Sequence, residues 1–144
     1  MTSPYDLFKE KQIDETTPAI LDYGSFQIHI KHGGASNKPF VNAAQFKLKQ
    51  FERRDQLQEK GSLSDDALKE LEADKQRVLV DMYAEHVIVD WKDVTDKEGN
   101  ELKFNKENVV KLLTDLPILF QDIIQQAMDV SNFKEVEEKE SEKN

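Results

Sequence analysis

The acidic stretch from Asp93 to Glu101 is the first place where side chains could be expected to bind a metal ion. It contains Gly99, and the EF-hand calcium loop requires a glycine at its sixth position. In that register Val94 would occupy the first ligand position, and Asn105 would stand where the loop requires a bidentate glutamate. The spacing therefore does not fit calcium and indicates a solvated turn.

The three histidines are the other candidate metal ligands. His29 falls on the polar side of an alternating segment, His32 lies near the end of that segment, and His86 is remote in the sequence. Nothing in this spacing predicts that the three imidazoles meet, as a zinc site would require. We expect two surface histidines and one at a helix end.

The usual local signatures of catalysis are missing from the sequence. The chain has no cysteine, no glycine-rich phosphate loop, no Gly-x-Ser-x-Gly elbow and no His-Glu-x-x-His pair. Paired carboxylates are abundant, but an acidic chain provides them by chance. We therefore expect a non-enzymatic binding protein without catalytic residues, metal ligands or cofactors.

Residues 31–60 are basic, whereas the chain as a whole is acidic. The formal net charge of this segment is +4, whereas the rest of the chain carries −13. Its basic residues are Lys31, Lys38, Lys47, Lys49, Arg53, Arg54 and Lys60. A basic helix over residues 38–60 could contact RNA, but aromatic side chains do not interleave with the basic ones in a recognisable pattern. We favour a solvated face or a patch for an acidic protein partner.

The segment that begins at Pro117 carries more apolar residues than a one-sided surface helix needs. These residues are Ile118, Leu119, Phe120, Ile123, Ile124, Ala127 and Met128. Burial in the core alone would explain them; the alternative is that one stripe packs in the core and another binds a partner helix. We predict that Phe120 and Ile124 are the exposed pair, because an aromatic residue beside a β-branched one commonly anchors a partner. Ile118 and Met128 complete the predicted partner-binding set.

Two elements are expected to come first in the folded region. An apolar run at residues 19–21, a turn at residues 22–24 and the alternation of apolar and polar residues over 26–31 predict a small N-terminal β-hairpin with one buried face. An antiparallel helix pair should follow. Its first helix runs to about Lys60 and stops at Gly61, and its second begins after the N-cap Ser64.

A second short hairpin is expected after the helix pair. Residues 87–91 are β-branched and aromatic, and the turn at residues 96–100 precedes Leu102 and Phe104. Trp91 is the sole tryptophan, and its size predicts a position in the core.

The C-terminal part completes the predicted domain. Asn105 suits the N-cap of a short helix, and Pro117 opens the last helix. We predict a single globular domain over residues 18–133, with a flexible N-terminal arm at residues 1–17 and a disordered acidic tail at residues 134–144, whose composition offers almost nothing apolar to bury.

The composition agrees with one mainly helical domain. The chain has 144 residues, of which 38% are hydrophobic and 34% charged, so a narrow apolar stripe and a wide charged surface are expected. We predict an α+β fold that is predominantly α-helical. The net charge of −9 makes nucleic acid and membrane surfaces unfavourable partners. No apolar run approaches the roughly 18 residues of a membrane helix, and no secretory signal is recognisable.

The stretch from His86 to Phe133 resembles the tail assembly chaperones of long-tailed bacteriophages. That family shows a tryptophan followed by a short acidic segment, a glycine in a turn, a polar helix cap, a leucine-rich helix, a proline-started helix and a terminal asparagine-phenylalanine. The matching segments are Asp90-Trp91-Lys92-Asp93-Val94, Asp96-Lys97-Glu98-Gly99-Asn100, Asn105-Lys106-Glu107-Asn108-Val109-Val110-Lys111-Leu112-Leu113, Leu116-Pro117-Ile118-Leu119 and Ser131-Asn132-Phe133. The similarity extends to the N-terminal hairpin and to residues 37–54.

The resemblance implies a helper that binds the tape measure protein, keeps its long hydrophobic helices soluble and helps to recruit tail tube subunits, often through a frameshift-extended form. It also implies action in the host cell cytoplasm and absence from the mature virion, while the oligomeric state, including a homo-oligomer, stays open. The alternatives are a structural tail or neck protein retained in the virion, and a small nucleic-acid-binding regulator that uses the basic helix over residues 38–60.

Overall fold

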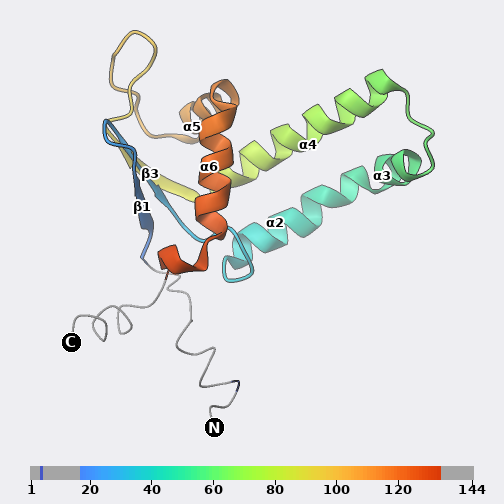
Figure 1. Ribbon diagram of the computed structural model, residues 1–144, viewed down its shortest axis with the longest axis horizontal. Helices are drawn as coiled ribbons and strands as arrows, with labels where there is room; N and C mark the ends of the chain where they lie inside the picture. The colour runs from blue at the N-terminus through green and yellow to red at the C-terminus, as the bar shows by residue number, and fades with distance from the viewer. Residues whose placement is uncertain (1–3, 5–16, 134–144) are drawn as a thin grey trace.

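The computed structural model describes residue 4 and residues 17–133. The predicted tail at residues 134–144 lies outside the described residues, and so does the predicted arm apart from residues 4 and 17. The described part combines a small antiparallel sheet with a larger helical portion (Figure 1). The predicted fold class, α+β and mainly helical, is confirmed.

Three short antiparallel strands form the sheet in the order β1-β2-β3. They are β1 (Ala19–Asp22), β2 (Gln27–Ile30) and β3 (Ile88–Lys92). The first two strands form the predicted hairpin, in which Ala19 pairs with Ile30 and Leu21 with Ile28. Ile28 and Ile30 are fully buried, so the expected buried face of the alternating segment is confirmed.

The third strand joins this hairpin instead of opening a second one. Ile28 of β2 pairs with Trp91 of β3, and the chain beyond β3 forms a loop that is closed by a single bridge between Thr95 and Glu101. This loop stands in place of the predicted second hairpin. The reason is burial: pairing with β2 brings Trp91 into the core at 8% exposure, where its indole N–H donates to the carbonyl of Leu102 at 2.9 Å. The expected core position of Trp91 is confirmed.

In the acidic loop after β3, a carboxylate of the loop stabilises the turn. Asp96 accepts hydrogen bonds from the backbone N–H groups of Glu98 at 3.0 Å and Asn100 at 2.9 Å. Gly99 adopts a φ of +84°, a conformation in which glycine has no steric cost. The turn that the sequence predicts here is therefore present.

A helical hairpin, residues 38–86, projects from the rest of the molecule (Figure 1). One side consists of α2 (Lys38–Leu48), the 3-10 turn η1 (Lys49–Phe51) and α3 (Glu52–Glu59), and the other side is α4 (Asp65–His86). The predicted single first helix is thus interrupted by η1. Ser64 accepts from the N–H of Ala67 at 3.1 Å, so the predicted N-cap of the second helix is confirmed.

The helical hairpin has a small apolar interior of its own. Phe51 and Leu71 are buried, at 2% and 1% exposure, yet neither belongs to the main core cluster. Arg54 and Asp74 form an ion pair of 2.9 Å between the two sides. The outer half of the hairpin is therefore held together separately from the main core.

Two further helices cover the sheet. They are α5 (Lys106–Asp115) and α6 (Pro117–Met128), followed by the 3-10 turn η2 (Val130–Phe133). Asn105 caps α5 by accepting from the N–H of Asn108 at 2.8 Å, and Pro117 is in the first turn of α6, as predicted. In Figure 1, α6 stands between the sheet and the helical hairpin.

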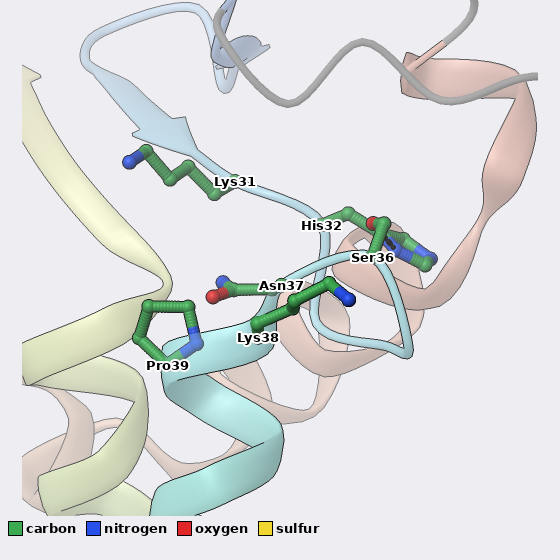
Figure 2. A pocket seen from close by; sticks show the side chains of 6 residues that line it. All are labelled: Lys31, His32, Ser36, Asn37, Lys38 and Pro39. Carbon is green, nitrogen blue, oxygen red and sulfur yellow. Dashed lines mark hydrogen bonds between the residues drawn. The ribbon is translucent and has the colours of Figure 1, made fainter.

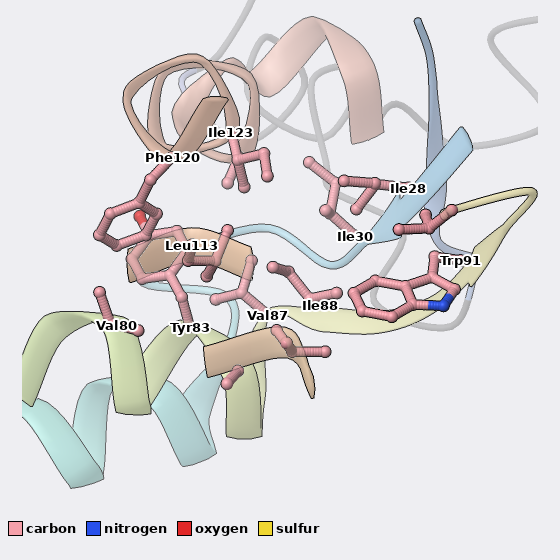
Figure 3. Close-up of a cluster of buried hydrophobic side chains, with 14 of the residues drawn as sticks. Ile28, Ile30, Val80, Tyr83, Val87, Ile88, Trp91, Leu113, Phe120 and Ile123 are labelled. Carbon is pink, nitrogen blue, oxygen red and sulfur yellow. The ribbon is translucent and has the colours of Figure 1, made fainter. Parts of the chain in front are cut away.

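The main core cluster lies where these elements meet. Figure 3 shows strand residues facing residues of α4, α5 and α6 across one apolar interior. Its labelled members are Ile28, Ile30, Val80, Tyr83, Val87, Ile88, Trp91, Leu113, Phe120 and Ile123. This cluster fixes the orientation of α6, and it therefore decides which face of α6 remains outside.

Candidate partner-binding surface

The core stripe of α6 differs from the one that the sequence suggests. Phe120, Ile123 and Ala127 are all fully buried. They follow one another at spacings of three and four residues, which places them on one side of a helix. The predicted exposure of Phe120 is therefore wrong. Its ring packs edge to face on Tyr83 of α4, with ring centroids 5.3 Å apart, so it fills the space between α4 and α6.

The other predicted site residues divide into two groups. Ile124 is half-buried and packs against the core cluster, so it is not exposed in the way predicted. Ile118 is 86% exposed at the start of α6, and Met128 is 61% exposed at its end. The structure thus separates Ile118 and Met128, which a partner could reach, from Phe120 and Ile124, which serve the core.

The exposed face of α6 carries no formal charge. Pro117, Ile118, Gln121, Gln125 and Met128 are the exposed residues of this helix in the part of the chain that the structure describes. A chain in which 34% of residues are charged therefore presents an uncharged helical face, which costs little to desolvate against a partner.

A groove of about 250 Å³ lies beside the start of this face. Leu102, Leu112 and Leu116 provide its apolar lining, and Leu116 itself is 46% exposed. The remaining lining residues come from the loop after β3 and from α5: Thr95, Asp96, Lys97, Glu98, Lys111 and Asp115. We call Leu102, Leu112, Leu116 and Ile118 the α5–α6 corner.

Sequence reasoning missed the groove because its lining comes from two separate segments. Leu112 and Leu116 share one side of a helix by their spacing of four, and this was the available signal. The position of Leu102 against them depends on how the loop after β3 folds back. In the structure the N–H of Leu102 donates to the carbonyl of Val94 at 2.8 Å, which holds the loop in place.

A hydrogen bond fastens α6 to the turn between β1 and β2. The hydroxyl of Tyr23 donates to the carboxylate of Asp122 at 2.7 Å. Burial of Tyr23, together with this hydrogen bond and the charge of Asp122, raises the pKa of the phenol. Because Asp122 lies on a flank of α6, this bond helps to keep the uncharged face turned outward.

A smaller hollow of about 170 Å³ lies at the start of α2 (Figure 2). Its polar side chains serve the local structure: Asn37 donates to the carbonyl of His86 at 2.9 Å, and His32 shares a hydrogen bond of 2.7 Å with Ser36. In Figure 2 the side chains of Lys31 and His32 point in opposite directions. Lys31 and His32 therefore do not converge on a common point in this hollow.

The three histidines lie in different surroundings. His29 is half-buried on β2, and within the described residues its Nε2 is buried without a hydrogen-bond partner. His32 is also half-buried and contacts Phe133 with ring centroids 5.3 Å apart, and His86 ends α4. His29 and His32 are therefore less exposed than the predicted surface histidines. Among the residues that the structure describes, no group of three or more His, Cys, Asp or Glu could hold a metal ion. Within the same residues, none of the helices has the length and apolar character needed to cross a membrane.

Part of the chain matches a known protein family. A family model described as YdaY prophage protein matches residues 35–144. No curated protein and no solved structure matches the chain. The matched region contains α2 to α6, and with them the helical hairpin and the α5–α6 corner. Because this match covers most of the sequence, the chain belongs to the YdaY prophage protein family and is of phage origin.

Proposed function

We propose that this chain is a tail assembly chaperone. It binds the tape measure protein, keeps it soluble in the host cell cytoplasm and helps to recruit tail tube subunits, and it is absent from the mature virion. It acts by binding and not by catalysis. Membership in a prophage family supports a phage role, and the resemblance of residues 86–133 to the tail assembly chaperones supports tail morphogenesis in particular.

The observation that carries this proposal is the α5–α6 corner. Leu116 lines the groove and is 46% exposed, and Ile118, two residues further along the chain, exposes 86% of its surface. Removing one side chain of this size from water contributes roughly 1.5–3 kcal/mol. The hydrophobic helix faces of a tape measure protein would aggregate if they stayed exposed, so a chaperone must cover them with an apolar surface of its own. The charged rim, which includes Lys111 and Asp115, can stay hydrated while the apolar part is covered.

Co-expression with the cognate tape measure protein tests the proposal. The wild-type chain should keep the tape measure protein in the soluble fraction, and the double variant L116T/I118T should lose much of this effect. Ile20→Thr is the matched control, because it shortens another exposed aliphatic side chain, 58% exposed on β1, away from the corner. Circular dichroism melting of each variant checks that the domain is folded.

Two outcomes would contradict the proposal. The first is equal precipitation of the tape measure protein with and without the wild-type chain. The second is recovery of the chain in fixed stoichiometry from purified virions by mass spectrometry, which would favour a structural tail or neck protein.

A further inference from the structure

Two basic residues on the first side of the helical hairpin pair with carboxylates of α4. Lys47 donates to Asp81 at 2.8 Å, and Arg54 donates to Asp74 at 2.9 Å. Both acceptors belong to α4, so these two cations hold the sides of the hairpin together. They are not free to bind a partner.

A second group faces away from α4. Phe46 is 79% exposed, and the exposed cations Lys49 and Arg53 follow it by three and seven residues. The exposed amide Asn42 precedes it by four. Asn42 and Phe46 lie on α2, Lys49 lies in η1 and Arg53 lies on α3. Successive members of this set are three or four residues apart, a spacing that brings side chains close together in a helix. We call Asn42, Phe46, Lys49 and Arg53 the Phe46 surface.

The charges of this surface are available to a partner. Within the described residues, neither Lys49 nor Arg53 forms a salt bridge. The nearest exposed carboxylate in the sequence, that of Glu52, follows Lys49 by three residues, but within the described residues the two do not form a salt bridge. The exposed ring of Phe46 thus shares this segment with two exposed cations that form no salt bridge within the described residues.

We propose that the Phe46 surface docks an acidic amphipathic segment of a protein partner. An apolar side chain of that segment covers the ring of Phe46, and its carboxylates pair with Lys49 and Arg53. Charge complementarity supports this occupant, since an aromatic anchor flanked by cations matches an apolar residue flanked by carboxylates. The surface is on the helical hairpin, away from the α5–α6 corner, so this inference does not depend on tape measure binding.

A nucleic acid fits the Phe46 surface less well. An extended phosphate backbone would be repelled by a chain whose net charge is −9. Sequence-independent binding of single strands also uses several aromatic rings in series, and this surface offers one. A short acidic segment interacts mainly with the local positive charge.

Fluorescence anisotropy with a labelled helical peptide of leucine and glutamate tests the inference on the full chain. Phe46→Ser should weaken binding about tenfold, as expected for loss of an aromatic anchor. The double variant K49E/R53E should weaken it similarly. That variant should also bind a matching leucine and lysine peptide more tightly than the wild type does. Lys69→Glu, which reverses an exposed charge on α4, is the control and should change neither affinity.

Each arm of the test can overturn the inference. Equal affinity of the acidic peptide for the wild type, F46S and K49E/R53E would exclude docking at this surface. Binding of oligouridine, with the same dependence on Lys49 and Arg53 and without binding of the acidic peptide, would assign the surface to nucleic acid. Circular dichroism of both variants separates loss of docking from loss of folding.

Discussion

Tyr23 and Asp122 are joined by a hydrogen bond of 2.7 Å across 99 positions of sequence. The phenol belongs to the turn after β1, and the carboxylate belongs to α6. The bond therefore connects the first hairpin of the chain to the helix that carries the uncharged outer face. It adds a polar contact between two elements that otherwise meet through the apolar core.

Tyr23→Phe should lower the free energy of unfolding by about 1.5 kcal/mol, because the substitution removes a donor to a charged acceptor. The value is at the low end of the range since both residues are only half-buried. Urea denaturation measures the change. Unchanged stability would show that water replaces the phenol at Asp122 without cost.

Alkaline pH should destabilise the wild-type protein. The pKa of Tyr23 is raised, first by burial and then by Asp122, and burial also raises the pKa of Tyr83. The unfolded chain releases these phenol protons near pH 10.0, whereas the folded chain keeps them to a higher pH. This stabilisation is complete below that pH and is lost as the pH rises through the folded pKa values. Unfolding curves above pH 10.0 should therefore show a shallower decline for Tyr23→Phe than for the wild type.

Phe120 and Ile118 should respond to substitution in opposite ways. Phe120→Ala empties a fully buried position and should cost about 3–5 kcal/mol. Ile118→Thr changes a side chain that is 86% exposed and should alter stability by no more than about 0.5 kcal/mol. Chemical denaturation of both variants checks the contrast. A stable Phe120→Ala protein beside an unfolded Ile118→Thr protein would reverse the assignment of the two faces.

Gly33→Ala should destabilise the contact between the loop before α2 and the end of α6. An added Cβ would lie 3.1 Å from the hydroxyl oxygen of Tyr83 and 3.2 Å from the Cβ of Ala127. Overpacking of this kind costs about 1–3 kcal/mol. Adding Tyr83→Phe removes the closer atom and should reduce the penalty, which a double-mutant cycle measures. Strict additivity of the two substitutions would argue against this contact.

Local chemistry made several elements predictable from the sequence. Ser64 and Asn105 cap helices because a short polar side chain before a helix satisfies an amide that has no partner in the helix. Pro117 begins a helix for a related reason, since its missing N–H is not needed there. Ile28 and Ile30 are buried because every second residue of a strand faces the same side.

Long-range packing explains what the sequence did not predict. The spacing of apolar residues in α6 allowed two stripes, and packing against other elements, including Tyr83 of α4, places Phe120 inside. The pairing of β3 with β2 joins residues far apart in the sequence. The local sequence, with a turn at residues 96–100, instead favoured pairing of residues 87–91 with the segment just after that turn. The α5–α6 corner likewise depends on a loop that returns to α5. Of the four predicted partner-binding residues, Ile118 and Met128 are strongly exposed, whereas Phe120 and Ile124 pack in the core.

The separate interior of the helical hairpin makes α4 a shared element of two structural units. Its Leu71 belongs to the apolar contacts of the hairpin, while Val80 and Tyr83 belong to the main core. Opening at the Gly61 end would expose Phe51 and Leu71 without disturbing the sheet, so it costs less than global unfolding. Amide hydrogen exchange should therefore proceed by local opening in α3 and the first half of α4, and by global opening in the last turns of α4.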